Sequence, residues 1–307
     1  MTLALDGVSL GCGNFGGVGS APAFFGQGIA EEDARAIMDR AWEAGIRWFD
    51  TADAYGGGRS ESFIGRWRAD RDAGGLRLTT KVFHPMAEGG DRGLAPDRIR
   101  RQLEGSLERL GVDRVDLYLA HEPDPDTPLA ATVGALEALA AEGLIGAWGL
   151  SNFGADDLRE ALALGRPALV QNAYSLLDRG DEEAVIPLCV EAGVGYVPFG
   201  PLSGGWLTGK YRRGEPYPVG SRMTQRPEPY ERLVADPVFD GLERLAAEAE
   251  ERDTTMAALA FAWVLASPGV TGAVCGPNRA DQLDPVLEAR ELELDVADRD
   301  RIGGFFA

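Results

Sequence analysis

The amino-acid sequence predicts an α/β fold: a single (β/α)8 TIM barrel over residues 1–307, with a short N-terminal β-hairpin and a long loop after strand 7. Short β-type runs alternate with amphipathic helical patterns along the chain, which is typical of a parallel sheet with crossover helices. No linker-like or low-complexity tract interrupts the alternation. Eight repeats favour a closed barrel over an open doubly wound sheet, and no GxGxxG follows the first strand to indicate a Rossmann fold.

The predicted strands are short apolar runs that follow helical patterns. The first lies near Leu10, after a hairpin turning at Asp6-Gly7, and the others are expected near 46–49, 77–82, 115–119, 145–150, 168–171, 194–198 and 271–275. Three helix-to-strand joins resemble one another: "EAGIRWFD", "AEGLIGAWGLS" and "EAGVGYVPFG". We expect their glycines, Gly45, Gly143 and Gly193, to adopt a left-handed conformation that ends each helix.

The helices between these strands are predicted from apolar residues spaced three or four apart. One such face follows Pro96-Asp97 and consists of Ile99, Leu103, Leu107 and Leu110. Another follows Thr127-Pro128 and consists of Leu129, Val133, Leu136 and Ala140. The most apolar stretch, residues 256–266, is too short to span a bilayer and is interpreted as a buried helix.

Composition excludes several classes of partner and compartment. A net charge of −19 argues against nucleic acid or an anionic membrane surface. The three cysteines, Cys12, Cys189 and Cys275, lie far apart and form neither a CxxC motif nor a disulfide framework. No signal peptide is recognisable in "MTLALDGVSL". We therefore expect a cytoplasmic protein without a metal site that acts on a small molecule; its oligomeric state is left open.

Polar residues end one predicted strand after another, and a barrel gathers its chemistry at those ends. In chain order the residues at the strand ends are Asp50, Lys81, His121, Ser151-Asn152, Gln171-Asn172, Phe199 and Gly276. Each has an ordinary structural interpretation, such as a helix cap, a solvated lysine or a structural histidine. Several compatible groups converging on one end of a barrel favour a catalytic site instead.

Asp50, Tyr55, Lys81 and His121 together suit the polarisation and protonation of a carbonyl. A tyrosine with an ordinary pKa of about 10 is a weak acid, and a neighbouring ammonium is expected to lower that pKa. Asp50 would hold Lys81 in place, and His121 would orient a substrate oxygen. Three glycines, Gly56 to Gly58, allow a sharp turn after Tyr55, and Ser60 is expected to cap the following helix. Such a site needs a hydride donor.

A local excess of cations suggests where that donor binds. Residues 207–226 contain one acidic residue, Glu215, against the basic residues Lys210, Arg212, Arg213, Arg222 and Arg226. They follow a glycine-rich turn, Ser203-Gly204-Gly205. This combination suits a pyrophosphate, although a solvated loop with scattered charge is the alternative.

Several stretches, taken together, resemble successive blocks of the aldo-keto reductase superfamily. They are "FDTADAYGGGRSE", "TTKVF", "VDLYLAHEPD", "GLSNF", "VQNAYSLLDR" and "GPLSGGWLTGKY", in the family's order, and the resemblance runs from about residue 8 to about residue 290. It implies an enzyme that transfers a hydride from NADPH to the carbonyl of an aldehyde, ketone or keto-sugar. It also implies the catalytic tetrad Asp50, Tyr55, Lys81 and His121, with Tyr55 as the proton donor.

The same resemblance implies a set of cofactor-binding residues. Ser151, Asn152 and Gln171 would bind the nicotinamide carboxamide, and Phe199 would stack on the ring. The rest of the dinucleotide would lie against Gly200, Pro201, Leu202, Ser203, Gly205, Lys210, Arg222, Gly276, Asn278, Arg279 and Gln282. Asn278 and Val286 depart from the family's pattern at the adenosine end, so NADH remains open and a 2′-phosphate contact would fall to Arg279 or Arg222.

The substrate pocket is predicted to involve Phe24, Phe25, His84 and Trp206, although the aromatic residues could equally pack the barrel top. Three other functions are weighed. A Schiff-base lyase would use Lys81, and a glycosidase would use Asp50 with Glu122 or Asp124. A regulatory subunit would bind the dinucleotide without physiological turnover. The lyase leaves the basic loop unexplained, and an intact tetrad argues against the regulatory subunit.

Overall fold

The computed structural model describes residues 7–306, and within them eight parallel strands form one sheet in the order β7-β6-β5-β4-β3-β2-β1-β8. Hydrogen bonds from Thr271 N to Tyr196 O and from Val274 N to Pro198 O link β8 to the β7 segment, so the sheet closes into a barrel. The strands are β1 (Gly7–Gly11), β2 (Trp48–Asp50), β3 (Arg77–Val82), β4 (Val115–Ala120), β5 (Ile145–Ser151), β6 (Leu169–Gln171), β7 (Gly195–Tyr196) and β8 (Gly272–Cys275). The predicted barrel is confirmed.

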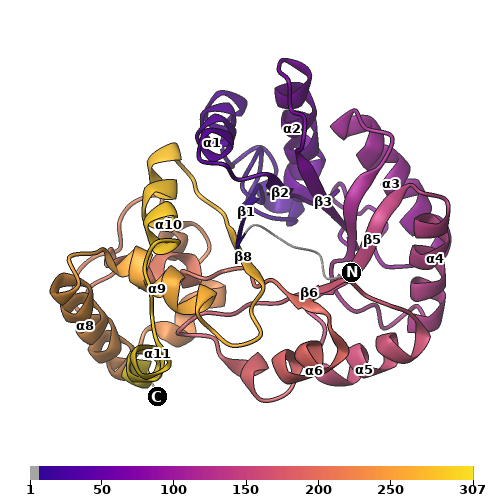
Figure 1. The fold of residues 1–307 in the computed structure, drawn as a ribbon. Coiled ribbons are helices and arrows are strands. Elements are labelled where there is room, and N and C mark those ends of the chain that lie inside the picture. The colour runs from indigo at the N-terminus through magenta and orange to yellow at the C-terminus, as the bar shows by residue number, and fades with distance from the viewer. Residues whose placement is uncertain (1–6, 307) are drawn as a thin grey trace.

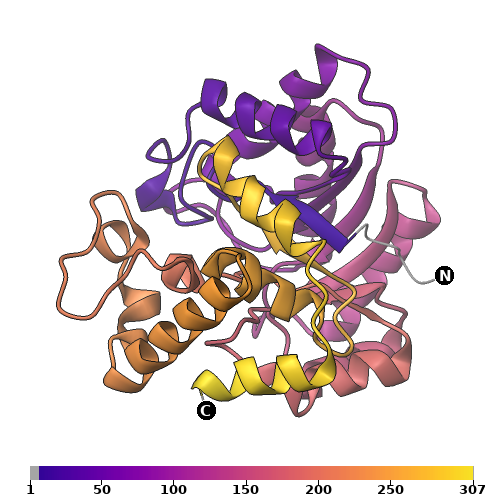
Figure 2. The ribbon, with the colours of Figure 1, turned by 60° about the vertical axis from the view of Figure 1, so that its left-hand side comes forward.

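Helices surround this barrel, as Figure 1 shows. The described helices are α1 (Glu31–Glu43), α2 (Arg59–Ala69), α3 (Pro96–Leu110), α4 (Leu129–Ala141), α5 (Ala155–Leu164), α6 (Val185–Ala192), α7 (Arg222–Gln225), α8 (Asp236–Glu251), α9 (Met256–Leu265), α10 (Asp284–Ala289) and α11 (Val296–Gly303). The long segment predicted after strand 7 runs from β7 to α8, contains only short helical turns and α7, and projects from the side of the barrel in Figure 2. The hairpin expected before Gly7 lies outside the described residues.

The local signals read from the sequence account for most of these boundaries. Gly45, Gly143 and Gly193 have φ values of 82°, 79° and 67°, so each ends its helix in the predicted left-handed conformation. In α3, Ile99 and Leu103 are fully buried, and α9 is buried along nearly its whole length. No helix among residues 7–306 is long and apolar enough to cross a membrane.

The core has two layers, and the period of two along each strand separates them. Residues on one face of the strands pack with the surrounding helices, as Phe49 does against Trp67. The other face fills the barrel interior with a second cluster: Trp48, Leu117, Leu119, Leu169, Val197 and Val274. Two residues beyond Trp48 on the interior face is Asp50, and two beyond Leu119 is His121. The same alternation that fills the barrel therefore aims these side chains at its open end.

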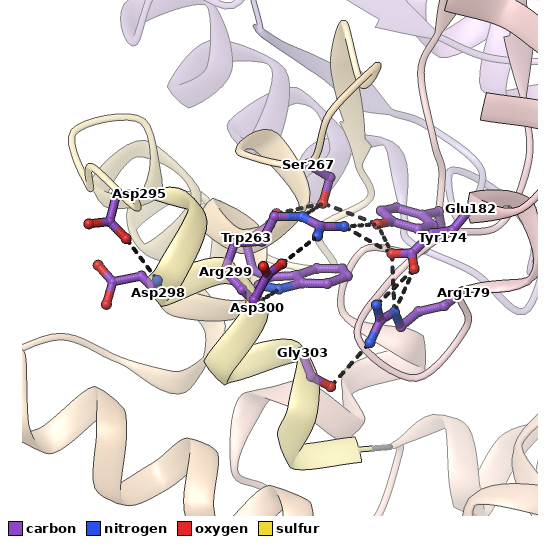
Figure 3. Close-up of polar contacts among 10 residues, drawn as sticks. All are labelled: Tyr174, Arg179, Glu182, Trp263, Ser267, Asp295, Asp298, Arg299, Asp300 and Gly303. Carbon is purple, nitrogen blue, oxygen red and sulfur yellow. Dashed lines mark hydrogen bonds and ion pairs between the residues drawn. The ribbon is translucent and has the colours of Figure 1, made fainter. Parts of the chain in front are cut away.

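The C-terminal helix α11 is held against the loop that follows β6 (Figure 3). Arg299 donates to Glu182 and to the Tyr174 hydroxyl, and Trp263 donates its ring N–H to the carbonyl of Arg299. Arg179 donates to the carbonyl of Gly303 and pairs with Glu182. These contacts hold α11 against the segment that follows β6.

One local prediction is wrong. Ser60 does not cap helix α2, because the residue at the cap position is Gly58 in a left-handed conformation. Ser60 Oγ instead donates to the carbonyl of Cys12 and lies 2.8 Å from the hydroxyl of Thr51. Ser60 therefore ties α2 to the strand ends. Glu61 is buried and binds Thr80 and Arg109, so it also has a structural role.

Candidate active site

A buried ion pair forms the base of the candidate site. Lys81 Nζ, at the end of β3, donates to Asp50 Oδ1, the last residue of β2, and to the carbonyl of Thr51 at 3.0 Å. Lys81 is 1% exposed and Asp50 is 4% exposed. The second carboxylate oxygen of Asp50 accepts a hydrogen bond of 3.0 Å from Gln171 Nε2, which comes from β6. Both charges are thereby satisfied without water, as burial requires.

Burial alone would lower the pKa of Lys81, but the neighbouring Asp50 carboxylate and Tyr55 oxygen reverse this effect and raise it. The lysine therefore stays protonated through the neutral range. Because its ammonium is already shared between Asp50 and a backbone carbonyl, it is a fixed charge and not a free amine.

Tyr55 lies directly above this pair. Its ring centroid is 5.2 Å from Lys81 Nζ, and its hydroxyl is 3.4 Å from Nε2 of His121. Three successive glycines with φ of 61°, 67° and 87° turn the chain sharply after the tyrosine, as predicted. A Cβ on Gly56 would lie 2.7 Å from the carbonyl oxygen of Phe15, so this turn also needs glycine for space.

The expected lowering of the tyrosine pKa is not found. Burial and the Asp50 carboxylate raise the pKa of Tyr55, and the opposing effect of Lys81 is smaller. The physical reason is that burial has the largest effect on the phenol, and Asp50 offsets part of the lowering caused by Lys81. Tyr55 is consequently a neutral phenol that carries its proton at neutral pH.

His121 completes the group from the end of β4. Burial, with the charges of Lys81 and His84 adding to it, holds the pKa of His121 well below its ordinary value, so the imidazole is neutral. Its Nδ1 has no hydrogen-bond partner among residues 7–306, while Nε2 faces Tyr55. An imidazole with its proton on Nε2 suits both atoms, because it leaves only an acceptor unpaired. Asn152 donates to the carbonyl of His121 and fixes the strand end.

A second set of residues converges beside this group, on the segment after β7. Ser203, Gly204 and Gly205 have φ of 46°, 64° and 94°, a run of left-handed residues. The N–H groups of Ser203 and Gly205 donate to the carbonyls of Gly200 and Leu202, which closes the turn. A Cβ at Gly205 would lie 2.2 Å from Lys210 Nζ, so only glycine admits the lysine there. Burial lowers the pKa of Lys210, and the nearby charges of Arg222 and Arg279 lower it further.

A polar bridge joins this segment to the loops after β1 and β8. Arg222 Nη2 donates to Asn14 Oδ1 at 2.6 Å, and Asn14 Nδ2 donates to Asn278 Oδ1 at 2.7 Å. Asn278 N donates to Gln282 Oε1, and Arg279 pairs with Asp281. The cationic side chains of Lys210, Arg222 and Arg279, with the glycine-rich turn beside them, suit an extended diphosphate. The residues present therefore fit a dinucleotide.

The other predicted site residues differ in their burial and in the elements they contact. Phe199 is partly buried at the top of the barrel interior, and Ser151 and Gln171 end neighbouring strands on the same face. Phe25 lies against the glycine turn after Tyr55, and the guanidinium of Arg226 is 6.0 Å from the ring of Phe24. Pro201 is buried, Leu202 is partly buried, and Gly200 and Gly276 are exposed at the same end of the strands.

Trp206 corrects the prediction for the substrate pocket. Its side chain has no exposed surface and packs against Tyr211 and Phe239. Trp206 therefore belongs to the core beneath the segment after β7 and does not line the pocket. Val286, the other departure from the family pattern, is also buried and has no side-chain access to the adenosine end.

Two residues near the site were missed by the sequence analysis. Asn14 bridges Arg222 and Asn278, and its position just beyond the end of β1 matches the strand-end pattern that identified the others. Glu122 was considered only as a glycosidase acid, yet its Oε1 lies 3.2 Å from Nε2 of His84. Neither contact is visible in sequence spacing, since each joins different loops.

Comparison with known proteins agrees with this arrangement. The model of the Aldo/keto reductase family matches residues 8–305. The uncharacterized oxidoreductase YrpG of Bacillus subtilis (strain 168) is 37% identical over 88% of this chain and 86% of that protein. A probable voltage-gated potassium channel subunit beta of Oryza sativa subsp. japonica is 32% identical over 87% of this chain and 85% of that protein.

Solved structures show the same fold. The glycerol dehydrogenase AKR11B4 from Gluconobacter oxydans superposes with a TM-score of 0.84 and 26% identity, covering 97% of this chain and 90% of that one. The thermostable aldo-keto reductase Tm1743 superposes with a TM-score of 0.77 and 27% identity, covering 97% and 94%. With the family match spanning nearly all the described residues, the chain belongs to the aldo/keto reductase family.

Proposed function

We propose that this protein reduces the carbonyl of an aldehyde, ketone or keto-sugar with NADPH, using Tyr55 as the proton donor. The observation that carries the proposal is the neutral Tyr55 hydroxyl, which lies between a buried Lys81–Asp50 pair and a neutral His121. Family membership and the oxidoreductase relatives support carbonyl chemistry in general. The structure named glycerol dehydrogenase indicates that the reverse direction, alcohol oxidation, is also open to this fold.

Each residue has a separate task in this scheme. Nε2–H of His121 and the Tyr55 hydroxyl would donate hydrogen bonds to the substrate carbonyl oxygen and position it. Tyr55 then transfers its proton to that oxygen, and the fixed ammonium of Lys81 stabilises the phenolate left behind. Asp50 keeps Lys81 protonated, and Gln171 holds Asp50. When bound, the dihydronicotinamide supplies the hydride.

The dinucleotide would be held by residues on several loops. Ser151, Asn152 and Gln171 would bind the nicotinamide carboxamide, and Phe199 would stack on its ring. The left-handed turn at Ser203, Gly204 and Gly205, with Lys210, would hold the pyrophosphate. Arg279, near Lys210, favours a cofactor that carries a 2′-phosphate, and Arg222 holds the segment in place through Asn14.

The geometry counts against the two other enzymes that were weighed. A Schiff-base lyase needs an uncharged amine, whereas Lys81 is paired and its pKa is raised. A glycosidase needs two available carboxyl groups, whereas Asp50 is saturated by Lys81 and Gln171. The second candidate function is a dinucleotide-binding regulatory subunit, which is favoured by the similarity to probable potassium channel beta subunits.

One experiment separates reduction from regulatory binding: NADPH oxidation by the parent protein and by Tyr55→Phe against a panel of carbonyl compounds. We expect turnover by the parent and a loss of about 10²–10⁴-fold in kcat for the variant. NADPH affinity, measured by fluorescence titration, should stay the same in both proteins, since the hydroxyl serves the substrate. Equal turnover by the two proteins would refute the role of Tyr55, and tight NADPH binding without any turnover would favour the regulatory subunit.

A further inference from the structure

Glu122 is a carboxylate at the mouth of the site that the proposed reaction does not use. It directly follows His121 at the end of β4, and its side chain is 42% exposed. Its Oε1 lies 3.2 Å from Nε2 of His84, whose ring centroid is 4.8 Å from that of His121 in an edge-to-face arrangement. Glu122 is therefore connected through one imidazole to the group that would orient the carbonyl.

The His84–Glu122 pair has a fixed position. The buried Arg98 of α3 donates to the carbonyl of His84 at 2.8 Å and to the carbonyls of Asp91 and Gly93. These bonds tie the backbone of the loop between β3 and α3 to α3. Because the backbone of His84 is held and its ring lies against His121, the imidazole offers Glu122 a partner in a defined place.

Glu122 also gives the mouth an ionised hydrogen-bond acceptor. The Asp50–Lys81 pair is neutral overall and His121 is neutral, so they contribute no net charge toward a substrate. The hydrogen bond from His84 and the nearby Arg92 guanidinium hold the pKa of Glu122 below its ordinary value, so it is ionised at neutral pH. The neighbouring acid Asp124 accepts hydrogen bonds from Leu94 N and Asp126 N in its own loops.

From this arrangement we infer that Glu122, oriented by His84, is a specificity-determining residue that selects uncharged carbonyl substrates bearing a hydroxyl group away from the carbonyl. Its Oε2 accepts no hydrogen bond from residues 7–306 and can accept one from that hydroxyl, whereas a carboxylate substituent offers it no donor. The inference rests on the proposed carbonyl reduction and names its substrate class: hydroxylated aldehydes and ketones, open-chain sugars included.

Three rigid aldehydes of similar size test this inference: 4-(hydroxymethyl)benzaldehyde, 4-ethylbenzaldehyde and 4-carboxybenzaldehyde, each with NADPH. The parent should prefer the hydroxymethyl compound in kcat/KM, by about tenfold over the ethyl compound. Glu122→Leu should reduce that ratio to about one, since both the charge and the acceptor are lost. Glu122→Gln should raise the relative kcat/KM of the carboxylate compound by about tenfold, because the amide group can donate a hydrogen bond to that carboxylate.

Glu88→Gln is the matched control, since Glu88 is an exposed acid in the same loop between β3 and α3. It should leave both ratios at the parent values, and melting curves of all variants confirm that folded proteins are compared. Ratios that are the same in the parent and both Glu122 variants would overturn the inference while carbonyl reduction stands. A parent that reduces none of these aldehydes and no other carbonyl compound would overturn both.

Discussion

At the Tyr55 hydroxyl, burial and two opposite charges compete, and the result determines which form of the side chain the site holds. Burial and Asp50 favour the neutral phenol, and Lys81 favours the phenolate. Because Asp50 is bonded to Lys81, its charge offsets part of the effect of Lys81 on the phenol, and burial decides the outcome. Before a substrate reacts, the Tyr55 hydroxyl therefore carries its proton. The Lys81 charge becomes useful only when the tyrosine gives that proton away.

Lys81→Met tests the role of Lys81 as the charge that stabilises the tyrosine phenolate. We expect the variant to lose at least about a hundredfold in kcat, because the phenolate formed in the reaction would have no cation beneath it and Asp50 would be left as an unpaired buried charge. The measurement is steady-state NADPH oxidation.

A chemical test shows whether Lys81 forms a Schiff base with a ketone. Borohydride added to the parent with a ketone should leave the mass of the peptide containing Lys81 unchanged, since the lysine is protonated and paired. A substrate-sized mass increase on Lys81 would instead revive the Schiff-base alternative. Asp50→Asn, which keeps the shape of the side chain but not its charge, is the control for loss of the ion pair alone.

At the scale of elements, the long segment after β7 connects loops that the strands themselves do not join. It reaches across to the loop after β1 through Arg222 and Asn14, and to the loop after β8 through Asn278. The two arginines of the predicted adenosine end differ in surroundings. Arg222 is partly buried within this bridge, whereas Arg279 is exposed and pairs with Asp281 at the surface.

This difference predicts separate effects on cofactor binding. Arg279→Ala should narrow the preference for NADP(H) over NAD(H) by about ten- to a hundredfold, since one charge-assisted contact to the 2′-phosphate is worth about 1.5–3 kcal/mol. Arg222→Ala should weaken both cofactors together, because it breaks the bridge to Asn14 that holds the segment in place.

Titration of both cofactors against the parent, the two variants and Arg290→Ala checks this prediction. Arg290 is the matched control, since it is an exposed arginine that follows α10. A parent that binds both cofactors equally would contradict the preference itself. If neither Arg279→Ala nor Arg222→Ala narrowed the gap between the cofactors, other residues would have to supply the discrimination.

Across the whole molecule, ion pairs near the C-terminus join helices that are distant in sequence. Glu248 of α8 accepts hydrogen bonds from Arg252 in the same region and from Arg301 of α11. Arg301 and then Arg252 lower the pKa of Glu248 to about 2, from an ordinary value of 4.5. The pKa in the folded protein lies below the unfolded value, so this stabilisation is fully present above pH 4.5 and is lost as the pH falls toward 2.

Glu248→Gln should therefore lower the free energy of unfolding at pH 7 by about 1–3 kcal/mol, a range that allows for the partial exposure of both arginines. The gap between parent and variant should shrink as the pH falls below 4.5. Urea unfolding at a series of pH values measures both effects. Glu250→Gln, an exposed acid on the same helix, should change little, and a gap that does not depend on pH would contradict the assignment.

The sequence by itself determined the barrel and the membership of its site, since both depend on local regularities. Alternation of strand and helix predicted the eight strands, and the strand-end pattern predicted Asp50 and His121 as candidates. The structure places both in line with the interior residues Trp48 and Leu119. The Asp50–Lys81 contact was expected from strand ends that meet at one face, and the structure brings the two side chains together.

Only the tertiary structure decided the features that depend on burial and on contacts between distant loops. Sequence spacing carries no measure of desolvation, so the raised pKa of Tyr55 and the fully buried ring of Trp206 were not predictable from it. The bridge through Asn14 and the contact of Glu122 with His84 each join loops whose approach is set by the closure of the barrel. The residue types at a site follow from local sequence, whereas their protonation and partners follow from what the folded chain packs around them.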